Sequence, residues 1–451
     1  MVDTKKNMLQ TEPSGLKSTE YLFSILKNRI EKELNALTDH NSKLNQSRID
    51  CLNYVLKRGL PNKNQKGWGY TELTWWLGFA FSENKTSPSD SSQYLKMLPP
   101  ESEFFILVVN GRVHADFCKL PNNISITELK DLEEHVLVDI LNKQELKTNT
   151  FTQLNCGLVQ NGFLLKADSI DLVKNINILY VDSAKNKENH FNQIHNVYML
   201  GENCQLNIVE RFWCATGTHF NNTVSQSFLS KGAKLTKYTL GSLASPNSMC
   251  QSMHTEFIQQ KDNSESKLYK FYFSEGKFKS EGTVRNNIVV EFDGVDSKSD
   301  IYSISMLSKT THVDNNIVIN HNAPNNISSQ IFKGVYDDGS SGVFDSCVVV
   351  KKHAQKTKTT QKNNNILLSS KSSINTNPQL EIFADNVECA HGSTIGELDE
   401  NALFYLNSRG LSKKVATNLL LSGFISEVTK MITDEAVKKE LLADLNKQLN
   451  L

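Results

Sequence analysis

The sequence predicts a mainly β protein whose central part is a β-solenoid, with helical segments at both ends. Short β-prone runs recur from about 164 to 395, separated by Asn, Ser, Gly, Asp and Lys, and no helix-length periodicity interrupts them. Regularly spaced strands are typical of a sandwich, a barrel or a solenoid. A sandwich seldom contains so many strands, whereas each coil of a solenoid contacts only its neighbours, so that any number can stack.

The strand predictions rest on nine runs rich in β-branched and aromatic residues, at 176–181, 195–200, 206–212, 234–240, 267–273, 287–292, 300–307, 315–320 and 347–352. Grouped asparagines fit the corners of a solenoid, where amide side chains stack in ladders. These asparagines occur at 221–222, 286–287, 315–316, 325–326 and 363–365.

Residues 1 to 150 are predicted to form a mixed, mainly helical N-terminal domain. Between about 17 and 60, one helical face is formed by Leu22, Ile25, Leu26, Ile30, Leu34 and Leu37. An aromatic cluster follows at Trp68, Tyr70, Trp75 and Trp76. Residues 104–120 read as a hairpin that turns at Asn110-Gly111, and helical segments are expected to resume from about 126 to 141.

The last fifty or so residues are predicted to form three helices, with Asp399, Ser412 and Thr433 as N-caps. Gly410 fits the position just after the first of these helices. The apolar face of the second helix is predicted from Val415, Ala416, Leu419, Leu420, Phe424 and Val428. This module is either a docking surface or a cap over the last coil of the solenoid, and the sequence supports both interpretations.

Composition excludes several classes of partner. The 451 residues include 49 Lys+Arg and 49 Asp+Glu, so the formal net charge is zero, which gives no reason to expect nucleic acid or an anionic membrane. No apolar run approaches the ~20 residues of a membrane span, and the N-terminus has no apolar signal core. The eight cysteines form no C-x-x-C pair. We therefore expect reduced thiols in a cytoplasmic protein.

The common catalytic signatures are missing. The sequence has no G-x-x-x-x-G-K-[ST] loop, so we do not expect this chain to hydrolyse ATP by itself. It also has no G-x-G-x-x-G after a strand, no H-E-x-x-H, no G-x-S-x-G and no paired C-x-x-C zinc site. With no nucleophile, base and orienting residue in view, we predict that the protein is not an enzyme.

Cys389 and His391 are the candidate metal ligands. Residues i and i+2 of a strand point to the same face, so these two side chains are expected side by side. A thiolate with an imidazole suits iron, zinc or an iron–sulfur cluster. Because structural zinc takes four ligands, two ligands leave a site incomplete, and the others would come from elsewhere in the fold or from another chain. The alternative is a buried cysteine and a hydrogen-bonded histidine near the end of a β-helix.

Weaker candidates lie upstream. His312 and Asp314 form a second same-face pair, in which the carboxylate would orient the imidazole or simply make a structural hydrogen bond. Cys347 is interpreted as a buried small apolar residue. A short basic patch at Lys351, Lys352 and His353 is interpreted as a solvated edge. The spacing of Cys204 and Cys214 shows no metal-ligand geometry.

Six ordered segments carry a resemblance to a known family. They are HVDNNIVINHNAP (312–324), SSQIFKGVYDDGSSGVF (328–344), AQKTKTTQKNNNILLS (354–369), PQLEIFADNVECAHGSTIG (378–396), LFYLNSRGL (403–411) and LLLSGFISEV (419–428). The C-terminal third thus resembles the SufB/SufD family of the SUF iron–sulfur cluster assembly system. The pattern at 389–396 resembles the SufD branch more than SufB. IVERF (208–212) and GWGYTEL (67–73) are weaker anchors.

The resemblance implies three domains: 1–150 helical, 151–396 a right-handed parallel β-helix, and 397–451 helical. It implies a complex with one SufB-like paralogue, bound through the β-helices, and two copies of a SufC-like ABC ATPase, bound through the C-terminal helices. The partner-binding residues would be Leu403, Phe404, Tyr405, Arg409, Gly410 and Phe424.

The resemblance also implies that His391 lies at the SufB–SufD interface and helps to build a nascent cluster, with Cys389 beside it and the ATPase opening the interface. No cofactor is then expected to bind the isolated chain tightly; iron and sulfide would be held transiently in the complex. Three residues depart from the family pattern, namely Asp345, Asn377 and Asn386. They put local turn geometry in doubt and leave Cys389 and His391 in place.

The sequence therefore predicts a scaffold or accessory subunit of a SufB–SufC–SufD complex that contributes ligands at the SufB–SufD interface. One alternative is a SufB-type homodimeric scaffold that needs no paralogue, and a homodimer of the isolated chain is also compatible with the sequence. Another is a carbohydrate-active β-helix enzyme. Such an enzyme would place clustered acids along one groove, and no such cluster is readable in the sequence.

Overall fold

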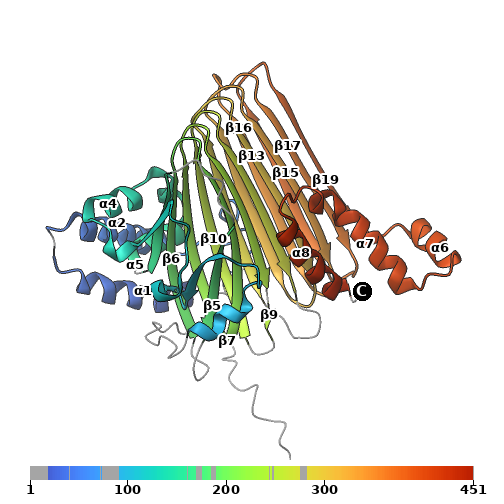
Figure 1. The fold of residues 1–451 in the computed structure, drawn as a ribbon, viewed down its shortest axis with the longest axis horizontal. Helices are drawn as coiled ribbons and strands as arrows, with labels where there is room; N and C mark the ends of the chain where they lie inside the picture. The colour runs from blue at the N-terminus through green and yellow to red at the C-terminus, as the bar shows by residue number, and fades with distance from the viewer. Residues whose placement is uncertain are drawn as a thin grey trace, which may run out of the picture.

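The computed structural model describes residues 19–39, 41–71, 73, 91–159, 161–168, 175–183, 189–242, 244–245, 248–274 and 282–449. Strands make up 45% of the protein and form a β-solenoid of about seven turns, with helices at both ends of the chain (Figure 1). The predicted fold class is therefore confirmed. No helix in the described part of the chain is long and apolar enough to cross a membrane.

Two sheets face each other across the interior of the solenoid, here called the lumen. Sheet A contains, in pairing order, β3 (Ile124–Glu128), β4 (Asn161–Ala167), β6 (Asn189–Leu200), the second half of β7 (Gln205–Leu229), β10 (Ser248–Gln260), β12 (Thr283–Phe292), β14 (His312–His321), β16 (Ser341–Val350) and β18 (Ser373–Ile382). The two-residue β9 (Ala244–Ser245) pairs with β10.

Sheet B contains, in pairing order, β2 (Arg112–Val113), β1 (Phe104–Val109), β5 (Ile176–Ser183), the first half of β7, β8 (Lys234–Ser242), β11 (Glu265–Phe273), β13 (Lys298–Leu307), β15 (Ile327–Tyr336), β17 (Lys358–Leu367) and β19 (Glu388–Gly396). From β4 onward, successive strands within each sheet are parallel. All nine predicted strand runs lie wholly or largely within these strands.

A residue with left-handed backbone recurs once per coil at one corner of the solenoid. Successive residues of this kind are 29 to 33 positions apart, and all have φ between 57° and 69°. Only residues that tolerate positive φ at low cost, such as Gly, Asn and Asp, suit this turn well. They are Asn203, Gly232, Asn263, Asp296, Asn325 and Lys356.

The grouped asparagines do stack in ladders, but mostly not at corners. Asn192 donates to Asn221 at 2.8 Å, and Asn286 donates to Asn315 at 2.8 Å, in each case between neighbouring strands of sheet A. Of the five groups only 325–326 lies in a turn, and the others lie inside β7, β12, β14 and β17. The corner prediction was wrong because inward-facing amides can satisfy one another from coil to coil inside the lumen.

The lumen is mainly apolar, with one buried charged network near its middle. Lys237 lies 3.1 Å from Glu210 and 2.7 Å from Glu256, and Lys270 lies 3.0 Å from the other oxygen of Glu256. All four side chains are at most 4% exposed. Two lysines and two glutamates balance in charge, as buried ions must if their desolvation is to be offset.

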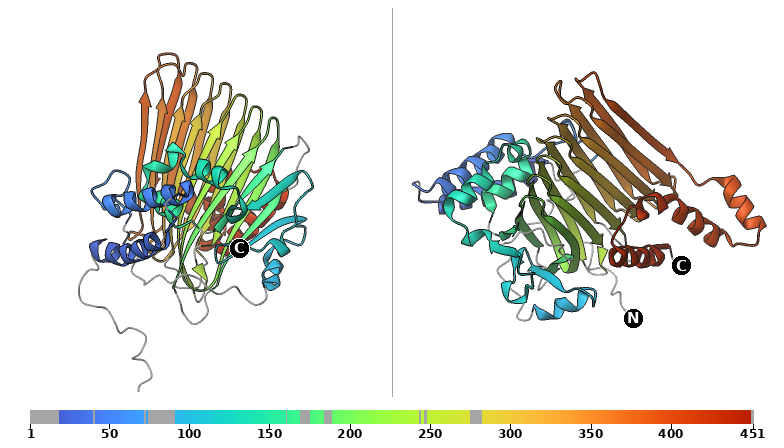
Figure 2. Two further views of the ribbon diagram at one scale, coloured as in Figure 1. Left: turned by 90° about the vertical axis from the view of Figure 1, so that its left-hand side faces the viewer. Right: turned by 45° about the horizontal axis from the view of Figure 1, so that its top comes forward.

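Four helices cover the N-terminal end of the solenoid (Figure 2): α1 (Thr19–Ala36), α2 (Lys43–Arg58), α4 (Glu134–Leu141) and α5 (Thr150–Leu158). The helical prediction over 17–60 is thus confirmed as two helices, α1 and α2. Phe151 of α5 packs with Phe220 of β7 in one apolar cluster, which attaches the helices to sheet A. Asn110 and Gly111 form the predicted turn, with φ of 51° and 80°.

Two N-terminal predictions need correction. Helical segments were expected over 126–141; the structure has the 3-10 turn Leu129–Asp131 and α4 there, but the range begins within β3. The second hairpin strand is only Arg112–Val113, followed by the 3-10 turn Ala115–Phe117. Because β1 and β3 extend the sheets of the solenoid, the N-terminal region is not purely helical, and the domain boundary at 150 stays a prediction. Trp75 and Trp76 lie outside the described residues.

The C-terminal helices are α6 (Glu400–Ser408), α7 (Lys413–Thr429) and α8 (Glu435–Leu449). Asp399 and Ser412 cap the first two, as predicted. The third cap is Asp434 rather than Thr433, because the Asp434 carboxylate accepts from the backbone N–H of Val437 at 2.9 Å.

α7 and α8 pack on the outer face of sheet B, over the stacked rings of Tyr238, Tyr269 and Tyr302. α6 projects away from the solenoid (Figure 1). The buried face of α7 includes Ala416, Leu421, Ile425 and Val428, whereas Val415 and Leu419 are exposed. The predicted face was therefore only partly right. The helix is apolar on more than one side, so spacing does not identify the side that meets the sheet.

Candidate functional site

The solenoid is open at its C-terminal end. β19 pairs with β17 along one edge only, and eight of its nine residues are exposed. β18, on the opposite sheet, is also largely uncovered. Large apolar side chains lie exposed there, with Phe383 59% and Ile395 51% accessible. A long uncovered edge strand with apolar neighbours is a surface suited to pairing with another sheet.

Cys389 and His391 both lie on the lumen side of β19. Ser393, two residues further along, has its hydroxyl 2.8 Å from that of Thr376 on β18, a contact that crosses the lumen between the two sheets. Because alternate residues of a strand share a face, His391 and Cys389 point to the same side as Ser393. The expected side-by-side arrangement is thus consistent with the backbone, and it lies at the rim of the open end.

The two side chains differ in environment. Cys389 is half-buried and packs against the apolar core of the lumen, and this burial raises the pKa of its thiol above the ordinary value. His391 is exposed. A thiol with a raised pKa is protonated at neutral pH, so a metal that binds it must displace the proton. The imidazole is the more accessible ligand of the two.

The rim does not supply a complete metal site. Within the described part of the chain, no three His, Cys, Asp or Glu side chains gather where they could hold a metal ion. Cys389 and His391 are therefore at most two of the ligands, and any further ones would come from outside the described residues or from another molecule.

His312 and Asp314 lie on the outer face of sheet A, on the side of the sheet away from the lumen. Thr71 connects them: its hydroxyl donates to Asp314 and lies 3.4 Å from Nε2 of His312. The carboxylate therefore does not bond the imidazole directly. Burial lowers the pKa of His312. The same Asp314 oxygen accepts from Arg285, which also donates to the Gly67 carbonyl oxygen at 2.7 Å.

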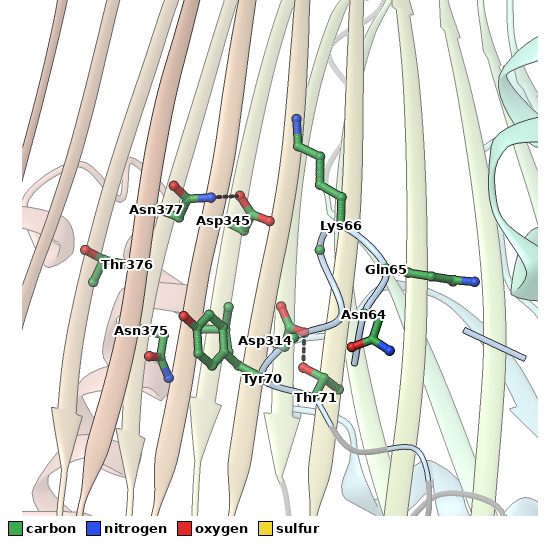
Figure 3. A pocket seen from close by; sticks show the side chains of 13 residues that line it. Asn64, Gln65, Lys66, Tyr70, Thr71, Asp314, Asp345, Asn375, Thr376 and Asn377 are labelled. Carbon is green, nitrogen blue, oxygen red and sulfur yellow. Dashed lines mark hydrogen bonds between the residues drawn. The ribbon is translucent and has the colours of Figure 1, made fainter. Parts of the chain in front are cut away.

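This network lies beneath the segment 64–71, which crosses sheet A and covers a polar hollow of about 440 Å³. Figure 3 shows Tyr70 and Thr71 from the segment on one side, and Asp314, Asp345 and Asn377 from the strands on the other. Asn377 donates to Asp345 at 3.0 Å. Burial raises the pKa of Asp345 despite this bond. The hollow is lined mainly by polar groups, some of which bond one another, whereas Oδ1 of Asp314 has no hydrogen-bond partner within the described residues. The bonds made by Thr71 and by the Gly67 carbonyl oxygen attach the segment to the solenoid.

The other sequence candidates do not gather into a site. Cys347 is half-buried on the outer face of β16, not fully buried as expected. Cys204 and Cys214 are both buried, and neither belongs to a metal-binding group in the described residues. The basic patch Lys351, Lys352 and His353 is an exposed turn after β16, as predicted.

The residues implied in partner binding fall into two groups. Phe404 and Tyr405 are 75% and 56% exposed on the projecting α6, where the Arg409 guanidinium lies 5.2 Å from the Tyr405 ring. Leu403 is half-buried on the same helix, and Gly410, with φ of 90°, turns the chain toward α7. Phe424 lies apart: it packs on the solenoid, with the Lys333 ammonium 4.7 Å from its ring.

Comparisons with known proteins agree with this fold. A family model described as "SUF system FeS cluster assembly, SufBD core domain" matches residues 183–424. The chain is 34% identical over 166 residues to the iron–sulfur cluster assembly protein SufD of Escherichia coli, covering 37% of this chain and 39% of that protein. It is 26% identical over 427 residues to a SufBD family protein of Synechocystis, covering 89% and 92%. The chloroplastic protein ABCI7 of Arabidopsis thaliana is 30% identical over 249 residues, covering 54% and 50%.

The fold and the rim define a β-solenoid protein that presents a thiol and an imidazole at an uncovered end. The family model spans more than half of the chain, and the chain belongs to the SufBD family of iron–sulfur cluster assembly proteins. The alignment with the Escherichia coli relative spans less than two thirds of that protein.

Proposed function

We propose that this protein is a non-enzymatic scaffold subunit in which Cys389 and His391 contribute ligands to an iron–sulfur cluster that is being assembled. Iron and sulfide are the cargo, held transiently. The observation that carries the proposal is the position of both residues on the lumen side of the last, uncovered strand. A thiolate and an imidazole suit iron–sulfur chemistry, and an incomplete pair at an open edge suits a site completed by a second chain.

The second chain in this proposal is a SufB-like paralogue that pairs with the uncovered end of the solenoid. The exposed edge of β19 offers unpaired backbone N–H and C=O groups, and the apolar side chains Phe383 and Ile395 lie near it. Another solenoid could continue the sheets across this junction and bring its own ligands to the rim. A second copy of this chain would fit the same edge, and the test below separates the two.

The energy source in this proposal is a SufC-like ABC ATPase bound to the projecting helix α6. The sequence lacks a P-loop, and the exposed aromatic side chains Phe404 and Tyr405 offer an apolar docking surface away from the solenoid. Since α7 connects α6 to the outer face of sheet B, movement of a bound ATPase would be transmitted to the solenoid.

The experiment is to co-express the chain with a SufB-like and a SufC-like protein, purify the complex, and measure iron and acid-labile sulfide after reconstitution. We expect His391→Ala to abolish cluster recovery and Cys389→Ser to reduce it, with the complex still intact. His353→Ala is the matched control, because it removes an exposed imidazole that lies in the turn after β16 and not on the lumen side of β19. Normal cluster recovery and normal in vivo complementation by His391→Ala would refute the ligand role. Recovery of homodimers only would refute the paralogue pairing.

A further inference from the structure

Gln361 occupies the position directly beneath His391 in the solenoid. β17 and β19 are parallel neighbours, and Gln361 is the register partner of His391. Neighbouring strands are about 4.8 Å apart, so in-register side chains on one face stack within reach of a hydrogen bond. The Gln361 side chain also points to the same side of the sheet as His391, because it is fully buried in the lumen and His391 lies on the lumen side of β19.

One end of the Gln361 amide is anchored. Its Nε2 donates to the Ser346 hydroxyl at 2.9 Å, and Ser346 in turn donates to Oε1 of Gln330 at 2.8 Å. This chain of bonds crosses the lumen from sheet B to sheet A and back. It fixes the amide plane, so that the orientation of the carbonyl oxygen is determined by bonds that do not involve β19.

The other end of the amide is unsatisfied. Oε1 of Gln361 is buried and accepts no hydrogen bond within the described structure. A buried acceptor without a donor destabilises the fold, and such groups in native proteins call for a specific explanation. The imidazole of His391 stands next in the stack, and one of its ring nitrogens carries a proton in the neutral form.

The composition of this ladder supports a specific role. The same inward position is Leu268 in β11 and Ile301 in β13, and it changes to Gln330 in β15 and Gln361 in β17 as the rim is approached. An apolar residue would fill the lumen equally well, as it does deeper in the solenoid. Two successive glutamines beneath His391 therefore point to hydrogen bonding rather than to packing.

We propose that Gln361 is the positioning residue of His391: when the exposed imidazole turns toward the lumen, Oε1 of Gln361 accepts a hydrogen bond from one ring N–H, and the other ring nitrogen is left unprotonated and directed out of the open end. A histidine that binds a metal commonly donates its second N–H to such an acceptor, which fixes the tautomer and the ring orientation. A neutral amide does this without adding charge at the rim. The metal-binding consequence rests on the proposed function, but the hydrogen bond itself does not.

The test reads the tautomer of His391 in the isolated full-length chain, labelled with ¹⁵N-histidine, by long-range ¹H–¹⁵N correlation; His391→Gln assigns the signal. We expect one dominant tautomer in the wild type and a mixture in Gln361→Met, which removes the acceptor at nearly constant volume. Gln361→Glu should restore the single tautomer, because a carboxylate oxygen in the same place also accepts a hydrogen bond. Thr359→Val, which removes another inward polar group of β17, should leave the tautomer unchanged. Identical tautomer populations in wild type and Gln361→Met would overturn the proposal.

A second readout separates this inference from the proposed function. In the co-expressed complex, Gln361→Met should lower the initial rate of cluster formation about 10-fold, because loss of the hydrogen-bond partner of a metal-binding histidine lowers metal affinity or activity by at least about that factor. Gln361→Glu should recover part of the rate. If His391→Ala leaves cluster assembly intact while Gln361→Met still scrambles the tautomer, the proposed function fails and the positioning role stands. If His391→Ala abolishes assembly but Gln361→Met changes neither tautomer nor rate, the positioning role fails alone.

Discussion

Inside the lumen, the ammonium nitrogen of Lys237 lies 2.7 Å from Oε1 of Glu256, with both side chains at most 4% exposed. Lys270 binds the other carboxylate oxygen at 3.0 Å, so one buried carboxylate accepts from two cations. Burial by itself would raise the pKa of Glu256, but the two lysines outweigh it and hold the pKa at about 2. Glu256 is thus ionised at neutral and mildly acidic pH.

This relationship predicts a pH-dependent stability. The folded-state pKa of about 2 lies below the ordinary value of 4.5, so the contribution of Glu256 is complete above about pH 4.5 and is lost as the pH falls toward 2. Glu256→Gln should lower the free energy of unfolding at pH 7 by about 3–5 kcal/mol, because Lys270 loses the one carboxylate that pairs with it among the described residues. It should also flatten the loss of stability below pH 4.5. Urea titrations at pH 7, 4.5 and 3 measure both effects.

Glu265→Gln is the matched control for this experiment. Glu265 binds Lys234 at 2.8 Å, but the two side chains are 37% and 51% exposed. An exposed pair of this kind contributes at most about 1 kcal/mol. Equal destabilisation by Glu256→Gln and Glu265→Gln would show that the buried network contributes no more than a surface ion pair.

A second prediction concerns the segment 64–71 on the outer face of sheet A. Asp314 accepts from both Arg285 and Thr71, and the Arg285 guanidinium also stacks 3.9 Å from the Trp68 ring. Asp314→Asn leaves the buried Arg285 without its counter-ion, so the segment should detach. We expect amide hydrogens of residues 64–71 to exchange at least 10-fold faster, while those of β14 and β16 keep their protection.

Asp345→Asn serves as the control for that measurement. Asp345 lines the same hollow but is bonded to Asn377 rather than to Arg285. Its pKa is raised by burial, so replacing it with a neutral amide removes little favourable charge. Faster exchange of the segment in Asp345→Asn as well would indicate that the hollow as a whole, and not the Arg285–Asp314 pair, holds the segment.

The strands and their order could be predicted from the sequence, but the coil-to-coil register could not. A ladder such as Lys237, Leu268, Ile301, Gln330 and Gln361 changes from charged to apolar and then to polar along its length, because the lumen is filled by whatever complements the neighbouring coil. The repeat survives mainly in backbone conformation, at corner residues from Asn203 to Lys356. Those residues change from Asn to Gly, Asp and Lys, and the signal is therefore weak in a single sequence.

The candidate site, too, could be predicted from the sequence only in part. Cys389 and His391 could be paired from their spacing, since strand periodicity is local. Gln361 was missed because it is adjacent to His391 only through the register, one coil away. The bond from Thr71 to Asp314 joins residues 243 positions apart, and no local pattern in either segment points to it. Contacts of this length become visible only once the coils are stacked.

A third prediction concerns the attachment of α8. The Arg211 guanidinium binds the Glu440 carboxylate through two nitrogens, at 2.9 and 2.5 Å, and donates to Asn177 at 2.7 Å. Arg211→Met should loosen α8 and speed proteolysis of the C-terminal helices several-fold, because the largely buried pair between the Arg211 guanidinium and the Glu440 carboxylate is lost. Glu435→Gln, which removes an 80% exposed carboxylate from the same helix, should have no effect. Unchanged proteolysis in Arg211→Met would mean that apolar packing alone holds α8.

The last prediction tests the projecting helix α6 as the docking surface for the ATPase. Phe404 and Tyr405 are mostly exposed and make little contact with the solenoid, so the double change Phe404→Ser and Tyr405→Ser should leave the melting temperature within about 2 °C. It should weaken co-purification of a SufC-like partner at least 10-fold, because exposed aromatic anchors dominate such interfaces. Leu442→Ser, at an exposed apolar residue of α8, should not weaken it. Phe424→Ser should instead lower the melting temperature, since that ring packs under Lys333. Undiminished co-purification of the double variant would exclude α6 as the docking helix.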